Sequence, residues 1–302
     1  MRFHLRTVAL ALLGLFFLAS NTFAGRKKEI VKTFEPKEVV RLEAVSGDLE
    51  VIMGTAEEIE VRLIYDYEPS GSFRPEFRER GRTLRLSEDM RGSNRGSSLW
   101  SLTVPEGTEI KFNTASGDVT AEEYKGYING STASGDIVLI NCEGEFDIST
   151  ASGDVEVEDS NGDFDLSTAS GDVIADGCEG SFRLSTASGD VEIDGITILQ
   201  HSSFSSASGD VDVRLGAGPK DDVSVSTASG DVVLDYNGHP IEGYFEFVAK
   251  YRDGHIISPI DFDDEERFRR WGQRYVAKSF TRGSDSPQIS IETASGRAEL
   301  RE

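Results

Sequence analysis

A short motif with a single carboxylate recurs through the middle of the sequence. The motif TASGDV begins at Thr114, and its copies supply the aspartates Asp118, Asp136, Asp154, Asp172, Asp190, Asp210 and Asp231. Ca²⁺ binds roughly six to eight oxygens, so a stacked column formed by Asp118, Asp136, Asp154, Asp172 and Asp190 is a candidate calcium site. In the calcium β-roll pattern, however, glycine stands two places before the aspartate, whereas Gly117 directly precedes Asp118. The spacing therefore favours aspartates that accept N–H bonds in a turn, and we predict no metal site.

Residues for other chemistry are sparse. Beyond residue 24 the chain has three histidines, His201, His239 and His255, all at irregular positions in the repeat. No G-x-S-x-G elbow occurs in the sequence. Because a serine nucleophile needs a base held beside it, a hydrolytic triad is disfavoured. Carboxylates are numerous enough to form a glycosidase pair by accident, so a polysaccharide-active β-helix enzyme is the enzymatic alternative. We predict no catalytic residue and no cofactor.

Glycine spacing sets the period of the chain. One set, Gly117, Gly135, Gly153 and Gly171, recurs every 18 residues, and Gly126, Gly144, Gly162 and Gly180 stand halfway between. Apolar residues follow each glycine by two and four places, as Val155 and Val157 do, which predicts strands with one inward face. A fixed period near 20 is typical of a solenoid, whose units stack to bury their apolar faces. We therefore predict an all-β fold, a parallel β-solenoid of 18-residue two-strand rungs with a β lead-in cap. An antiparallel β meander is the alternative.

The same residues carry a family resemblance. They are the SGDV steps, VSGDLEV at 45–51, LTVPEGTEIKFNTASGDV at 102–119 and ISIETASGRAEL at 289–300. With these motifs the chain resembles the bacterial adhesin-like β-repeat family of unknown function, also called the toast-rack domain. The resemblance covers most of the chain from about Phe34. It implies an extracytoplasmic β-repeat protein with no known catalytic residue set, in some members associated with envelope-stress systems.

The first 24 residues predict export. Arg2 and Arg6 precede an apolar run from Val8 to Ala19 and a small-residue site ending at Ala24, which is the order of a signal peptide. The run is shorter than the roughly 20 residues of a spanning helix, and no other segment is apolar enough to be an integral membrane span. We expect a soluble product that starts at Gly25 and lies in the periplasm, outside the cell or at the cell surface.

Charge limits the partners. The chain has 54 acidic and 31 basic residues, a formal net charge of -23. Such a surface repels phosphate backbones, so we do not expect nucleic acid as a partner.

The chain divides into five predicted segments. They are the signal peptide (1–24), an N-terminal β lead-in or cap (25–109), the regular repeats (110–236), an irregular excursion (237–287) and a closing repeat (288–302). The closing repeat replaces the aspartate of the motif by Arg297, as expected if its last step neutralises the column.

The excursion differs in composition from its surroundings. EGYFEFVAKYRDGHI predicts a hairpin with Asp253 and Gly254 at its turn. DFDDEERFRRWGQRY has acids first and arginines later, the order that a helix dipole favours, and is predicted as a short helix. The aromatic residues of that helix would share one face and either cover the end of the solenoid or form a partner patch, since Trp, Tyr and Arg are enriched where partners bind. The candidate patch consists of Phe268, Arg269, Arg270, Trp271 and Tyr275.

Two cysteines occupy one column of the repeat. Cys142 and Cys178 both stand seven places after an SGD glycine, with Ser160 in the same column between them. They would therefore lie two rungs apart, about 9.6 Å between Cα atoms, which exceeds the roughly 7 Å that a disulfide tolerates. We predict two unpaired thiols.

The sequence as a whole favours a non-enzymatic function. We expect a secreted, envelope-associated β-repeat protein that acts as a binding or scaffolding, adhesin-like module, with an envelope protein or polysaccharide as its partner. A component of envelope-stress signalling is a further alternative, implied by the resemblance alone. The oligomeric state is not set by any feature of the sequence.

Overall fold

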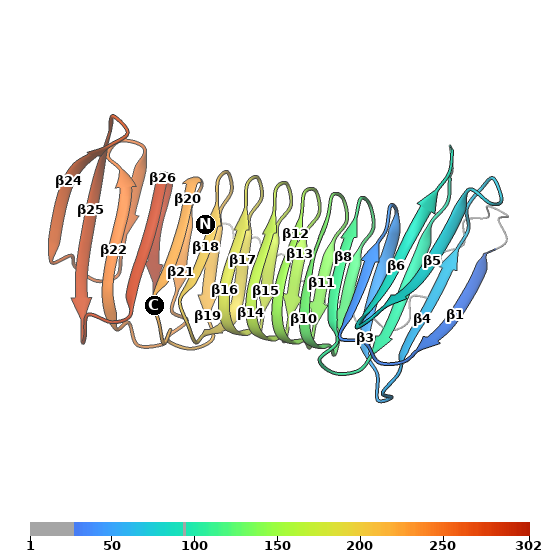
Figure 1. Ribbon diagram of the computed structural model, residues 1–302. Helices are drawn as coiled ribbons and strands as arrows, with labels where there is room; N and C mark the ends of the chain where they lie inside the picture. Colours follow the sequence, from blue (N-terminus) through green and yellow to red (C-terminus); the bar gives the residue numbers. More distant parts are fainter. Residues whose placement is uncertain (1–26, 93–94) are drawn as a thin grey trace.

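A computed structural model describes residues 27–92 and 95–302, and the predicted signal peptide lies outside them. These residues form 26 strands and no helix. The strands wind into one elongated solenoid, with two long sheets, here called sheet A and sheet B, facing each other across the core (Figure 1). The predicted all-β parallel solenoid is confirmed.

In space, sheet A contains β1(Lys28–Phe34), β4(Ile59–Tyr65), β7(Ser98–Val104), β3(Gly47–Met53), β9(Val119–Glu122), β11(Ile137–Ile140), β13(Val155–Glu158), β15(Val173–Asp176), β17(Val191–Ile198), β19(Val211–Leu215), β21(Val232–Asp235), the end of β26(Gln288–Arg301) and β23(Gly254–Ile257). Sheet B contains β5(Phe73–Arg80), β6(Thr83–Met90), β2(Val39–Glu43), β8(Glu109–Thr114), β10(Lys125–Thr132), β12(Glu143–Thr150), β14(Asn161–Thr168), β16(Glu179–Thr186), β18(Ser202–Ser206), β20(Val223–Ser229), the start of β26, β22(Gly243–Lys250), β25(Gln273–Arg282) and β24(Asp264–Arg270).

The repeats pair in parallel and in register. Phe146 of β12 lies beside Phe164 of β14, and Ile137 of β11 beside Val155 of β13, so partners are 18 residues apart. Each 18-residue unit is therefore one coil, with one strand in each sheet. This register excludes the antiparallel meander for the repeats.

In the core, residues at equivalent positions of successive coils form columns. Phe146, Phe164, Phe182 and Phe204 stack with ring centroids 5.2, 5.4 and 6.1 Å apart, and each is at most 2% exposed. A coil cannot bury these rings alone, because each ring is covered by those of its neighbours. Apolar burial of this kind, roughly 25 cal/mol per Å², makes every coil depend on the next.

The SGD corner brings consecutive backbones into contact. A Cβ added at Gly153 would clash with the carbonyl oxygen of Gly135, and the same clash recurs at the other glycines of this column. Beside it the buried hydroxyl of Thr168 donates to the carbonyl of Gly153 (2.8 Å), a bond repeated in neighbouring coils. At Gly153 the close approach alone requires glycine, because its φ lies outside the left-handed region.

The aspartates of the motif join coil to coil. Each Oδ1 accepts the backbone N–H of the equivalent residue in the next coil at 2.7–3.0 Å, in the order Asp48, Asp118, Asp136, Asp154, Asp172, Asp190, Asp210 and Asp231. The last acceptor, Asp231, receives the N–H of Arg297 and also binds the Arg297 guanidinium through Oδ2 (Nη2 at 2.6 Å). Burial would raise the pKa of Asp231, but the bonds from Arg297 hold it below its usual range.

Both ends of the solenoid contain a coil that is out of sequence order. β2 and β3 lie between β6/β7 and β8/β9, within the predicted lead-in. Likewise β26 lies between β20/β21 and β22/β23, so the C-terminal strand is stacked inside the excursion (Figure 1). Antiparallel strands extend the two sheets beyond these coils: β4 and β1 on sheet A, β5 on sheet B, and β25 and β24 on sheet B at the other end.

The two cysteines are free, as their spacing predicts. Cys142 and Cys178 are buried in one column with Ser160, whose hydroxyl accepts the N–H of Cys142 (2.9 Å). Burial raises the pKa of both thiols, that of Cys178 to about 11, so both are protonated at neutral pH.

Replacing a corner glycine should destabilise the solenoid. In Gly153→Ala the new methyl group would meet backbone atoms, so we expect a loss of about 1–3 kcal/mol in the free energy of unfolding, measured with urea. Gly218→Ala is the control, because a Cβ there meets nothing within 4 Å. Equal midpoints for the two variants would contradict the close-approach explanation.

The bond between Asp231 and Arg297 should give a pH-dependent contribution to stability. Because the folded-state pKa of Asp231 is depressed, the contribution is complete above the unfolded pKa near 3.8 and is lost as pH falls through the folded value. Arg297→Gln should therefore cost about 0.5–1 kcal/mol at pH 7 and less at pH 3, the range of partly exposed pairs. A difference between wild type and variant that is the same at both pH values would show that the ion pair contributes nothing.

Candidate functional site

The aspartate column does not gather its carboxylates around a common point. Each Oδ1 already accepts an N–H from the next coil, as described above, and these bonds need no cation. Across residues 27–92 and 95–302, no group of three or more His, Cys, Asp or Glu side chains is arranged to hold a metal ion. Calcium binding by Asp118, Asp136, Asp154, Asp172 and Asp190 stays a hypothesis of the sequence, and the contacts favour the turn-capping role.

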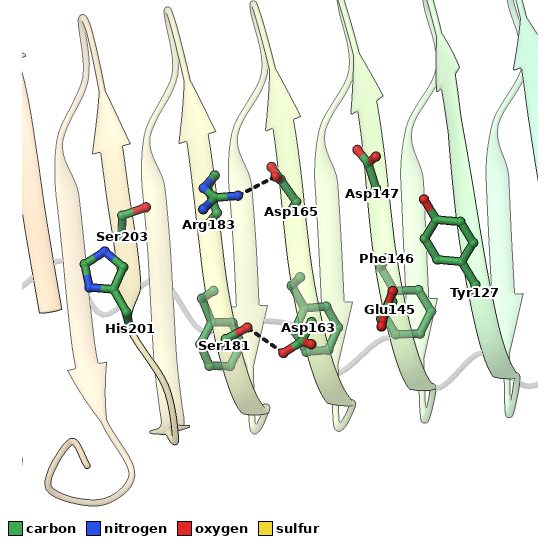
Figure 2. Close-up of a pocket in the computed structure, with 12 residues that line it drawn as sticks. Tyr127, Glu145, Phe146, Asp147, Asp163, Asp165, Ser181, Arg183, His201 and Ser203 are labelled. Atoms are coloured by element: carbon green, nitrogen blue, oxygen red, sulfur yellow. Dashed lines mark hydrogen bonds and ion pairs between the residues drawn. The ribbon is translucent and has the colours of Figure 1, made fainter. Parts of the chain in front are cut away.

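The outer face of sheet B forms a shallow acidic groove of about 390 Å³. Figure 2 shows two rows of side chains across its strands, one with Glu145, Asp163 and Ser181, the other with Asp147, Asp165 and Arg183. Neighbours in a row pair across coils: Ser181 Oγ donates to Asp163 (2.6 Å) and Arg183 to Asp165 (2.9 Å). These contacts stabilise adjacent strands, as cross-strand polar pairs do.

The outer face of sheet A is also acidic. Burial raises the pKa of Glu156 and of Asp176, and carboxylates nearby add to the effect. Burial also raises the pKa of Asp212, although Arg301 opposes the shift. These side chains line a groove of about 490 Å³ in which like charges recur from coil to coil. The face would repel anionic partners.

The excursion folds differently from the sequence prediction. The predicted helix is wrong: Asp264–Arg270 and Gln273–Arg282 are the antiparallel strands β24 and β25. The predicted hairpin around Asp253 is wrong as well, because β22 and β23 lie in different sheets and both run parallel to β26. Residues 251–253 therefore form the corner of a further coil. Pairing of β25 with β22 outweighs the weak helical preference of the segment.

The predicted patch lies on the β24–β25 hairpin but is not one aromatic face. Phe268 and Tyr275 are cross-strand partners with rings stacked at 5.8 Å, and Tyr275 is buried. Trp271 stands at the turn instead, 81% exposed, with the Arg270 guanidinium 4.3 Å from its ring centroid. Arg270 also pairs with Glu292 of β26 at 2.7 Å. The hairpin thus holds two separate contacts, an aromatic stack between its strands and an arginine–tryptophan contact at its turn.

Arginines concentrate on this hairpin. The stretch RFRRWGQRY, 267–275, has four arginines and no acid in a chain whose net charge is -23. Arg269 and Arg274 are directly opposite each other, and among the described residues neither guanidinium has an ion-pair partner. Like charges directly opposite destabilise a strand pair, so the arrangement has a cost that the fold does not require.

The patch predicted from the sequence omitted two arginines of this hairpin, Arg267 and Arg274. Arg267 lies 5.0 Å over the ring of Tyr251, and Arg274 faces Arg269. With Phe268 and Tyr275 these four residues line a groove of about 450 Å³. The signal was present as alternation along RFRRWGQRY, which on a strand separates the arginines 267 and 269 from Phe268.

The described part of the chain contains no helix long and apolar enough to cross a membrane.

Comparisons with known proteins identify the family of the chain. No curated protein matches the chain. A crystal structure of what is named "a putative cell adhesion protein" from Clostridium sporogenes ATCC 15579 is similar at 14% identity over 91% of this chain and 99% of that one, with a TM-score of 0.29. The profile of the Toastrack DUF4097 family matches residues 38–243, more than half of the chain. The chain therefore belongs to the toast-rack family.

Proposed function

We propose that this protein is a non-enzymatic binding module of the bacterial envelope, with the β24–β25 hairpin as its partner surface. The residues that would contact the partner are Arg269, Arg270 and Trp271 at the tip, supported by the stacked Phe268 and Tyr275. The coils would act as a scaffold that holds the hairpin at one end of an elongated body.

The conformation of Trp271 is the observation that carries the proposal. Trp271 and Gly272 form a two-residue hairpin loop, with φ of 50° and 76°. Positive φ at both positions is the type I′ turn, in which Asn-Gly or Asp-Gly is strongly preferred. A bulky residue at positive φ is strained, and a large indole ring that is 81% exposed adds nothing to the core. Trp at this position is explained by contact with a partner, where Trp and Arg dominate binding energy.

The signal peptide predicted at 1–24 supports an envelope location. Acidic outer faces on both sheets are compatible with a protein that stays in solution rather than on anionic lipid. The envelope partner is a protein or a polysaccharide. A polysaccharide-cleaving enzyme is the weaker proposal, because the carboxylates that line the two grooves of the described coils belong to the repeating rows.

Trp271→Asn should separate binding from folding. Asn-Gly is the preferred type I′ sequence, so the unfolding midpoint should stay constant or rise, while the fraction of protein retained by envelope material should fall about tenfold or more. Retention is measured by co-sedimentation of the purified protein with the envelope fraction of the producing bacterium.

Arg183→Gln on the outer face of sheet B is the matched control, and its retention should equal that of the wild type. Unchanged retention of Trp271→Asn would remove the hairpin from the proposal. A loss that is as large for Arg183→Gln would assign binding to the acidic groove instead.

A further inference from the structure

The two sheets end at different places at the C-terminal end of the solenoid. Sheet A stops at β23, which lies opposite β22, whereas sheet B continues with β25 and β24. Phe280, near one end of β25, packs on Phe245 (4.7 Å) and on Phe262 of the connecting loop. That loop covers the core at this point, since Ile260 and Phe262 pack against it.

Among the strands that the structure describes, none lies opposite the rest of the inner face of the hairpin. Strand alternation places Lys278, Val276 and Arg274 of β25 on the same face as Phe280, together with their partners Arg267 and Arg269 of β24. In every regular coil a strand of sheet A faces a strand of sheet B about 10 Å away. Here the inner face looks across a groove instead.

The groove runs along the free edge of β23. Its volume is about 590 Å³, and all four residues of β23, Gly254–Ile257, line it. Successive side chains of a strand point to opposite faces, so a lining that includes all four belongs to the edge of the strand. Within the described residues β23 pairs only with β26, and Ile257 is 42% exposed. An unpaired edge of this kind is a template for another strand.

The wall of the groove is cationic. Arg267, Lys278 and Arg297 line it with one carboxylate, Glu265, which pairs with Arg267 (2.9 Å) and Lys278 (3.5 Å). The neighbouring groove shares Tyr251 and Arg267 and adds the unpaired Arg269 and Arg274. A chain that lay along β23 and extended into this neighbouring groove would reach Arg269 and Arg274, which have no ion-pair partner among the described residues.

We propose that this groove binds an extended acidic peptide segment of another protein, which adds to sheet A as a strand beside β23. Backbone bonds to the edge of β23 would hold the segment, and its carboxylates would pair with Arg269 and Arg274. The proposal names the partner class of the hairpin and so rests on the proposed function. It also accounts for the opposed arginines, because an acid between them removes their repulsion.

A second copy of this chain is a poorer occupant. The free edges at the other end of the solenoid are β1 and β5, and each strand has one more basic than acidic residue. Neither strand offers the excess of carboxylates that the arginines of the groove favour.

Fluorescence anisotropy with a labelled peptide of alternating threonine and glutamate tests the proposal on the full chain. We expect binding that weakens about tenfold in Arg269→Gln/Arg274→Gln, while the urea midpoint of this variant stays constant or rises because the opposed charges are gone. The same peptide with lysine in place of glutamate should not bind. N-methylation of alternate amides along one edge of the peptide should abolish binding, and along the other edge should be tolerated, since a strand pairs through one edge.

Other outcomes overturn the proposal. The first is that the acidic peptide does not bind, and the second is that both N-methylated peptides bind as well as the unmodified one. The third is that an oligogalacturonate binds as tightly as the peptide and is weakened by the arginine variant, which would make the groove a polysaccharide site. Self-association of the protein that the arginine variant abolishes would assign the groove to a second copy.

The peptide assay and the envelope-retention assay are run separately, so that this proposal and the proposed function can fail independently. Arg183→Gln, which changes the outer face of sheet B and lies outside the groove along β23, should bind the peptide as the wild type does. If the peptide fails to bind while envelope retention still depends on Trp271, only the groove proposal fails. If retention is also independent of Trp271, both fail.

Discussion

The close contact between consecutive corners is the constraint on which the structure depends. Where two glycines are in backbone contact, as Gly153 and Gly135 are, each coil can pack directly against the preceding coil. At the same step, the hydroxyl of Thr150 donates to the carbonyl of Gly135, and the carboxylate of Asp136 accepts the N–H of Asp154. Because all three residue types are needed in one place, the motif repeats almost unchanged. The aspartates are explained by their bonds at the corners of the coils, and no ligand is needed to account for their regular spacing in the chain.

A structure built from one repeated contact has two ends that need different solutions. At both ends a coil out of sequence order, β2/β3 or β26, lies between coils that are distant in sequence. Val223 pairs with Ile289, 66 positions later, so the terminal segment is held on two sides. At the C-terminal end Arg297 replaces the aspartate and satisfies Asp231, and the column ends in an ion pair. Regularity stops there, and the cationic hairpin begins beyond it.

The sequence predicts the coil well and the ends poorly, for physical reasons. A fixed period of 18 implies its own register, so the columns of Phe164, Thr168 and the free thiol of Cys142 follow from counting. The insertion of β26 involves a pairing across 66 residues that no local pattern encodes. The segment from Phe268 to Tyr275 fits the residue pattern of a helix and also that of a strand. It is a strand because β25 pairs with β22 on one side and with β24 on the other. Trp271 with Gly272 was the local turn signal, hidden because Trp is rare where Asn is expected.

The central claim is that the repeats have a structural role and that the partner binds at the C-terminal end. Hydrogen–deuterium exchange of the intact chain, with and without envelope extract, tests this claim most directly. The account predicts new protection confined to about residues 251–282, which include β23, β24 and β25. Exchange in the coils between 110 and 236 should not change. Protection that spreads along those coils and leaves the hairpin unchanged would contradict the account.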